Sequence, residues 1–594
     1  MRSPIRPLSL PLCMLTLVVA PPLCAQGDAR TQLHALFDEA WEFELRDDPL
    51  FATAVGDRRF NDRLPSVTPA DGARRAAARR GFLARLRAID RAALDATDRV
   101  SYDMFERQLE DDLTAFAFRA YEIPITADAG FHVAFASLPR RVPLFSVQDY
   151  ENYLARLRAF PAYVGQHVEN MRAGLARGFS MPRIVLDGYD VTIASHVVDD
   201  AAESAFYAPF ASFPVSVPVA QRARLEAEGR AAIMQGAVAG YRAFLEFMTR
   251  EYLPGTRTSI GASDLPDGNE YYAYLVRHFT TLDLTPAEVH EIGLREVERI
   301  RAEMEAIVAE LEFDGTFADF LEMLRTDPRF YAETPGELLR EASYIAKRMD
   351  GKLPALFRTL PRLPYGIAPV PDHLAPKYTG GRYVPPAEGS TEPGYYWVNT
   401  YNLPARPLYT LAALTLHEAV PGHHLQGALT RELVGLPEFR RHSYINAFGE
   451  GWGLYSEWLG IEAGVYTDPY SNFGRLTYEM WRACRLVVDT GIHAFGWTRD
   501  RAMAYLASNT ALSLHEVRTE TDRYISWPGQ ALSYKLGELT IRELRRRAEQ
   551  ALGARFDVRE FHDVVLGQGT VPMTVLEHQV NAYIESELGG GTLR

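Results

Sequence analysis

The chain has 594 residues and a formal net charge of −14, with 47% hydrophobic and 24% charged residues. This composition is typical of a folded globular protein and excludes an intrinsically disordered one. Because no basic excess is available to neutralise phosphates, we expect no nucleic-acid partner. The length predicts more than one lobe, and the oligomeric state is left open.

The N-terminus resembles a secretory signal peptide. Two arginines precede an apolar run at 8–20, and a small residue, Ala25, ends the segment. This order predicts a signal peptide over residues 1–25, cleaved after Ala25, and a mature chain of 26–594 that is periplasmic or secreted. Lipid attachment to Cys24 is the less favoured alternative, because a bulky leucine precedes it. Nothing downstream is long and apolar enough to predict a membrane span.

Helical periodicity dominates the next part of the chain, from about 28 to 350. Apolar residues recur at helical spacing near 33–41 and again over 231–252. Thr285 followed by Pro286 is typical of a helix start, with a capping residue and a proline at the first position. We expect an N-terminal helical lobe here.

Residues 351–400 differ in composition from the segments on either side, because prolines recur throughout and Gly380 and Gly381 are adjacent. Proline forbids continuous helix, so this segment predicts loops and short strands. Tyr395 to Asn399, rich in aromatic and β-favouring residues, predicts one strand. From about 401 to 588 the chain is helical again, which completes a mostly α fold with a small β element. Cys484, the lone cysteine of the mature chain, is expected to be a buried, inert thiol.

The octapeptide His417-Glu418-Ala419-Val420-Pro421-Gly422-His423-His424 carries the main candidate chemistry. In the common zinc motif, two histidines four residues apart lie on one helix face. Here Pro421 occupies that position, and on an unbroken helix His423 would lie about 9 Å further along the axis than His417. Two ligand nitrogens must each come within about 2.1 Å of one ion. Because Pro421 and Gly422 favour a break, we expect a kink that returns His423 to His417. In the alternative, His424 and His423 exchange roles.

Two further glutamates complete the expected site. Glu450 follows His423 after enough residues for a turn and a return helix, and is the expected third ligand. Glu457 lies on the same helix face, as an alternative ligand or as the residue that orients a ligand histidine. Glu418 is the expected general base, taking a proton from a metal-activated water and passing it to the leaving amine. Two imidazoles and a carboxylate predict one Zn²⁺ per chain, although manganese, cobalt and iron accept the same ligands.

These segments resemble a bacterial family known as domain of unknown function 885, over most of the mature chain. The similar blocks are Thr280–Gly293, Pro393–Thr400, His417–Gln426, Glu450–Tyr455 with Glu457, Asp489–His493, Gly496–Thr498 and Pro528–Lys535. The resemblance implies a mostly helical zinc peptidase, similar in plan to oligopeptidases that use a His-Glu-x-x-His motif plus a glutamate. Such a protein is expected to have a large metallopeptidase-like fold, with a deep cleft and a small β element next to the metal.

The family-like blocks also supply candidates around the substrate. His493, Tyr534 and Arg523 could donate hydrogen bonds to the oxyanion that forms when water attacks a carbonyl. Arg523 and Lys535 could instead bind a substrate carboxylate. For each of these residues, structural pairing inside the fold is the competing interpretation.

Helical peptidases of this type commonly place a short strand beside the zinc, where a peptide can pair with its edge. This makes Tyr396 and Asn399 candidate substrate-binding residues. The leading hypothesis is therefore an exported zinc metallopeptidase acting on short peptides. A zinc amidase or esterase on a non-peptide substrate is the alternative, and a zinc-stabilised binding protein without turnover is a third. The substrate sequence, and whether cleavage is internal or terminal, stay open.

Overall fold

The computed structural model describes residues 23–372, 375–386 and 392–589. Within these ranges the chain is mostly helical with one small sheet, which confirms the predicted fold class at that level. Most of the predicted signal peptide, residues 1–22, lies outside the described residues, and Ala25 falls in the first turn of α1 (Leu23–Asp47). No helix within the described ranges has both the length and the apolar character needed to cross a membrane.

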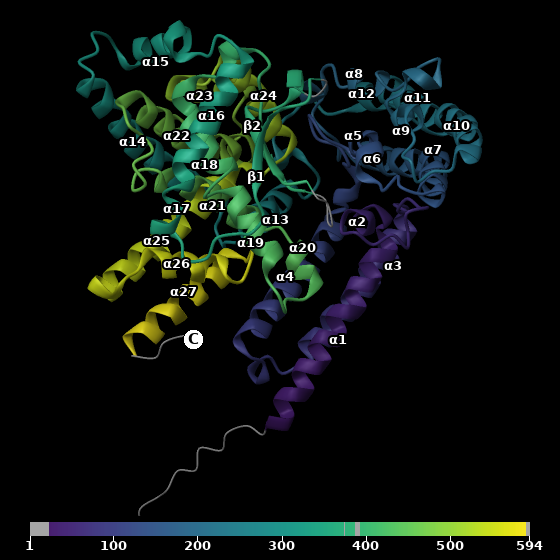
Figure 1. Ribbon diagram of the computed structural model, residues 1–594, viewed down its shortest axis with the longest axis horizontal. Coiled ribbons are helices and arrows are strands. Elements are labelled where there is room, and N and C mark those ends of the chain that lie inside the picture. Colours follow the sequence, from purple (N-terminus) through teal and green to yellow (C-terminus); the bar gives the residue numbers. More distant parts are fainter. Residues whose placement is uncertain (1–22, 373–374, 387–391, 590–594) are drawn as a thin grey trace, which may run out of the picture.

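The first part of the chain forms two groups of helices that lie side by side in Figure 1. The first group comprises α1, α2 (Pro49–Ala54), α3 (Pro69–Arg87) and α4 (Ala96–Phe118). The second group comprises α5 (Phe131–Ala136), α6 (Leu138–Arg141), α7 (Val147–Ala176), α8 (Val191–Ala194), α9 (Ala208–Ala211), α10 (Val219–Ala232), α11 (Ala239–Phe247) and α12 (Leu253–Gly255).

The rest of the helices form the larger body of the molecule (Figure 1). The helices before the sheet are α13 (Gly268–Thr280), α14 (Pro286–Glu310), α15 (Phe317–Thr326), α16 (Pro335–Asp350) and α17 (Leu353–Leu356). Those after it are α18 (Leu408–Glu418), α19 (His423–Glu432), α20 (Glu438–His442), α21 (Asn446–Leu459), α22 (Pro469–Phe495), α23 (Arg499–Asn509), α24 (Leu514–Ser526), α25 (Ser533–Leu552), α26 (Val558–Leu566) and α27 (Met573–Leu588). The predicted start of α14 is confirmed, because Thr285 and Glu288 form a capping box there.

The sheet has three strands in the order β1-β3-β2: β1 (Tyr365–Pro369), β2 (Gly381–Val384) and β3 (Gly394–Val398). β3 confirms the predicted strand to within one residue. It is the central strand, parallel to β1 and antiparallel to β2, so both of its edges are paired. The free edge next to the octapeptide therefore belongs to β2, which lies in the segment for which the sequence predicted loops and short strands.

Helix α18 lies between the two large hydrophobic cores of the molecule. Tyr409 and Ala413 belong to the core that also contains Cys484, which is buried as predicted. Leu411 and Leu416 belong to the other core, together with side chains of α1, α21 and α25. Because one face of α18 enters each core, its C-terminal end is held rigidly, and this end carries the first half of the octapeptide.

Candidate metal centre

The chain reverses sharply within the octapeptide. Helix α18 ends at Glu418 and α19 begins at His423, and the Gly422 N–H donates to the carbonyl oxygen of Leu416 at 3.0 Å. A Cβ atom at Gly422 would lie 1.9 Å from the carbonyl oxygen of His417, so only glycine allows this approach. The indole of Trp452 donates to the carbonyl oxygen of Pro421 at 2.8 Å and fixes the reversal. The predicted kink is confirmed.

The reversal brings three predicted ligands together. Nε2 of His417 lies 3.6 Å, and Nε2 of His423 3.5 Å, from Oε2 of Glu450, which α21 contributes. One ligand atom from each residue lies within 4.8 Å of the other two. Tetrahedral ligands at about 2.05 Å from a zinc ion would be about 3.3 Å apart. The three residues therefore fit a zinc ion without large rearrangement.

Glu457 orients His417 from the side opposite Glu450. Its Oε1 accepts a hydrogen bond from Nδ1 of His417 at 2.7 Å and lies 3.3 Å from the Arg482 guanidinium of α22. Because Nδ1 is engaged, Nε2 is left to face His423 and Glu450. The ring also packs against Gly453, where an added Cβ would lie 2.6 Å from it. The geometry thus favours the orienting role for Glu457 over the alternative ligand role.

The cluster stabilises positive charge. Burial alone would lower the pKa of His417, but pairing with Glu450 and Glu457 outweighs it and raises that pKa to about 10. Burial would raise the pKa of Glu450, yet pairing with His417 and His423 holds it well below its usual range. Both directions reflect the pairing of carboxylates with imidazoles, and the carboxylates that favour a positive charge on His417 would equally favour a divalent metal.

Glu418 lies at the boundary between the cluster and the sheet. Its Oε2 accepts a hydrogen bond from the backbone N–H of Tyr383, on the outer edge of β2, at 2.8 Å. His424 points to the same sheet: its Nδ1 lies 3.1 Å from the Tyr383 hydroxyl, and its ring packs on Tyr365. Burial lowers the pKa of His424 to about 4. The structure therefore places His423, and not His424, among the three clustered residues.

Tyr444 is a site residue that the sequence analysis missed. Its hydroxyl lies 3.2 Å from Oε1 of Glu450, and its side chain is 53% exposed, whereas the Glu450 side chain is 14% exposed. Enclosure of the phenol by protein atoms, with the charges of Glu450, Tyr534 and Glu418, raises its pKa well above the usual value. The Tyr534 hydroxyl accepts a hydrogen bond from Arg523 at 3.2 Å. Tyr534 and Arg523 thus stay candidates, next to Tyr444.

Two other predicted residues are engaged elsewhere, which corrects the roles expected for them. Both ring nitrogens of His493 are used, since Nδ1 accepts from the Ala262 N–H and Nε2 donates to the carbonyl of Tyr524. His493 also lies eleven residues further along α22 than Arg482, the residue that contacts Glu457 beside the cluster. Eleven residues of helix correspond to about 16 Å. Lys535 is fully buried, and its Nζ lies 2.8 to 3.1 Å from carboxylate oxygens of Glu296, Glu479 and Glu538. Neither side chain is available to a substrate.

The two candidates on the predicted strand are also structural. Tyr396 is fully buried in the centre of the sheet. The Asn399 amide donates to the carbonyl oxygens of Ala375, Tyr378 and Thr379, and so fastens the loop that precedes β2. Because both edges of β3 are paired within the sheet, a peptide cannot pair with it, and this part of the prediction is wrong.

Asp489, in the same block as His493, has a carboxyl group whose pKa is raised by burial, and this effect can be tested. It is fully buried and accepts hydrogen bonds from the Tyr272 hydroxyl and the Gly529 N–H, and burial raises its pKa from 3.8 to about 7. The folded protein therefore keeps a proton that the unfolded chain releases. This contribution to stability is full below pH 3.8 and is lost as the pH rises towards 7.

Replacing Asp489 by asparagine removes this titration and keeps an oxygen that accepts from Tyr272. Relative to the wild type, Asp489→Asn is expected to gain about 3 kcal/mol of unfolding free energy between pH 5 and pH 8. Denaturant unfolding of both proteins at the two pH values measures the change. A difference between the two proteins that does not vary with pH would contradict the raised pKa.

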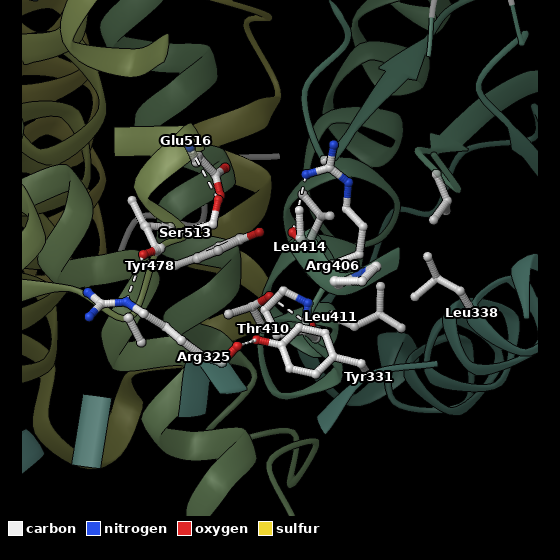
Figure 2. Close-up of a pocket in the computed structure, with 17 residues that line it drawn as sticks. Arg325, Tyr331, Leu338, Arg406, Thr410, Leu411, Leu414, Tyr478, Ser513 and Glu516 are labelled. Carbon is white, nitrogen blue, oxygen red and sulfur yellow. Dashed lines mark hydrogen bonds between the residues drawn. The ribbon is translucent and has the colours of Figure 1, made fainter. Parts of the chain in front are cut away.

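Two pockets lie near these residues. One, of about 390 Å³, is bounded by the N-terminal helices and by Tyr444 and Asn446. The other, of about 60 Å³, lies at the opposite end of α18 and is shown in Figure 2, where Thr410 and Leu411 line it with Glu516 of α24. Burial raises the pKa of Glu516 to about 7. None of the predicted site residues lines either pocket, but Tyr444 lines the larger one and contacts Glu450 of the cluster through its hydroxyl.

Comparison with known proteins gives a family and a fold. The model of a family described as "Bacterial protein of unknown function (DUF885)" matches residues 49–580. The crystal structure of the "putative lipoprotein from Colwellia psychrerythraea" is 30% identical with a TM-score of 0.86, over 94% of this chain and 99% of that one. A "putative lipoprotein of unknown function from Shewanella oneidensis" is 18% identical with a TM-score of 0.69, over 93% of this chain and 99% of that one, and shows the shared fold. No curated protein sequence matches this chain.

Proposed function

The chain belongs to the DUF885 family, and we propose that it is an exported zinc-dependent peptidase that hydrolyses short peptides. The observation that carries this proposal is the convergence of His417, His423 and Glu450 beside a fourth group, Glu418, that is not a member of the cluster. A structural zinc site is normally closed by four protein ligands, whereas three ligands and a neighbouring carboxylate are typical of hydrolytic sites. Export is supported by the N-terminal segment and by the description of the Colwellia relative as a lipoprotein.

Each residue has a distinct part in this proposal. His417, His423 and Glu450 would hold one Zn²⁺, which when bound supplies a polarised substrate carbonyl and a water of lowered pKa. Glu418 accepts the proton of the attacking water and delivers it to the leaving amine. Glu457 keeps His417 in the tautomer that presents Nε2 to the cluster.

Substrate placement follows from the free edge of β2. The Tyr383 N–H already points outwards from that edge to Glu418, so an extended peptide that pairs along β2 would pass directly over the general base. The Tyr444 hydroxyl, which contacts the proposed ligand Glu450, can donate to the developing oxyanion. The predicted cleft is therefore proposed to lie between β2 and the pocket beside Tyr444.

The proposal is tested by the zinc content of the purified mature protein and by its hydrolysis of a broad panel of short peptides. One zinc per chain together with hydrolysis that a chelator abolishes is the expected result. Stoichiometric zinc without cleavage of any peptide would shift the assignment to an amidase, an esterase or a binding protein. Absence of stoichiometric zinc would overturn the metal centre itself.

The proposed role of Tyr444 as an oxyanion donor can be tested separately. Tyr444→Phe is expected to lower kcat by about 100-fold, the usual effect of losing one oxyanion donor, while KM and zinc content stay unchanged. If Tyr444 only positioned Glu450, the variant would instead lose affinity for zinc. Steady-state kinetics and chelator competition separate the two, with Tyr401→Phe, at an exposed tyrosine outside the cluster, as the matched control.

A further inference from the structure

The pocket of about 390 Å³ lies between the N-terminal helices and the segment that precedes Glu450. Side chains of α1, α3 and α4 form one wall, and the segment from α20 into α21 forms the other. Tyr444 belongs to this second wall, and its hydroxyl contacts Glu450. A substrate held at the cluster could therefore extend a neighbouring side chain past Tyr444 into the pocket.

The polar part of the pocket has an excess of negative charge. The carboxylates that line it are Glu44, Asp48, Asp111 and Asp112, and the guanidinium groups are Arg79 and Arg107. With the histidines uncharged, four negative and two positive charges leave a net charge of −2. The pocket thus has two more carboxylates than cations to match them.

One arginine serves both of the central carboxylates. Arg79 donates to Glu44 at 2.9 Å and lies 3.0 Å from Asp112 through Nε. The Glu44 and Asp112 side chains still have 29% and 36% of their surface exposed, so each keeps oxygen surface that can accept from a bound group. Burial raises the pKa of both carboxyls despite the pairing with Arg79, which agrees with incomplete neutralisation.

The lining also includes an aromatic group, with Phe37, Trp41, Phe51, Phe82, Phe105 and Phe439. Trp41 packs edge-on against Phe51 and stacks on His442, and Phe37, Phe105 and Phe439 contact one another. Aromatic faces suit an aliphatic stem, and they also attract a cation that lies over them. A pocket with an aromatic wall and carboxylates therefore fits a group that has an apolar stem and a positively charged end.

From this combination we propose that the pocket binds the side chain of a lysine or arginine residue of the peptide substrate. The inference rests on the proposed peptidase function and adds a preference for basic residues to it. An α-amino group carries the same charge without the stem, so the aromatic wall distinguishes the two sources of positive charge.

Matched fluorogenic peptides test the preference with the zinc-loaded mature protein. The peptides differ at one position at a time among lysine, arginine, glutamine, norleucine and glutamate, each with a free and with an acetylated N-terminus. At one position, kcat/KM is expected to be about tenfold or more higher for lysine and arginine than for norleucine, with or without acetylation. Equal rates for all five residues, or a preference that follows only the free N-terminus, would overturn the assignment.

Variants locate the preference in the pocket. Glu44→Gln and Asp112→Asn, singly and together, are expected to reduce the lysine-to-norleucine ratio of kcat/KM. Glu39→Gln is the matched control, because Glu39 lies on α1 outside the pocket and pairs with Arg85 at the surface. Retention of the full ratio in the double variant, with an unchanged melting temperature, would contradict the proposal.

A binding measurement separates this proposal from the peptidase proposal. In the Glu418→Gln variant, calorimetry is expected to show tighter binding of a lysine peptide than of its norleucine counterpart. If the wild type cleaves no peptide, the peptidase function fails, and the calorimetric difference still decides whether the pocket recognises a basic side chain. If the wild type cleaves all peptides alike and calorimetry shows no difference, only the pocket assignment fails.

Discussion

Replacement of Glu418 by glutamine is expected to lower peptide hydrolysis by about 10²- to 10⁴-fold, because the variant has no carboxylate to accept the proton of the attacking water. Zinc content should not change, since Glu418 is outside the three-residue cluster. Glutamine has nearly the same shape and keeps an oxygen that can accept from the Tyr383 N–H, so the local structure is expected to persist. The effect should therefore fall on kcat and leave metal binding intact.

Parallel metal analysis and kinetics of the wild type and the Glu418→Gln variant measure this split. Glu549→Gln, which changes a carboxylate at the surface of α25, is the matched control and should behave as the wild type. Full activity of Glu418→Gln would remove Glu418 from the chemistry and would require another base. Loss of zinc in the variant would instead indicate that Glu418 is a ligand.

Local sequence was sufficient to predict the part of the site that depends on neighbouring residues. Pro421 and Gly422 lie inside the octapeptide, so the reversal that brings His423 to His417 could be derived from backbone chemistry alone. The β3 strand was predictable from its aromatic and β-favouring composition. Glu450 was found because a helix that returns to the motif needs a connection of about that length.

Several of the errors concern partners that are distant in the chain. His493 and Lys535 lie in blocks rich in polar residues, but their partners Ala262 and Glu296 come from segments more than 200 residues earlier. Tyr444 lies six residues before Glu450 but outside every motif, so no signal in the sequence indicated that its hydroxyl contacts that carboxylate. The order of the strands depends on the pairing of β1 with β3, which alternation of side chains does not reveal.

Separate alanine substitutions of His423 and His424 are expected to have opposite consequences for metal binding. His423 faces Glu450 at 3.5 Å, so His423→Ala removes one of three ligands and should abolish both stoichiometric zinc and hydrolysis. His424 contacts Tyr383 and Tyr365 on the side of the sheet, so His424→Ala should keep its zinc. Any loss of affinity there should not exceed the roughly 10- to 100-fold that is typical of residues that only support a ligand.

Competition with a chelator of known affinity measures both variants on one scale, and the melting temperature shows whether each one is folded. The reverse result, with zinc lost from His424→Ala and kept in His423→Ala, would mean that the ligand roles are exchanged. That exchange would require α19 to begin in a different orientation, because His424 now faces away from Glu450 with its Nδ1 engaged by the Tyr383 hydroxyl. The pair of variants thus tests whether the reversal at Gly422 selects the metal ligand, since the two histidines are adjacent and differ only in the direction that α19 gives them.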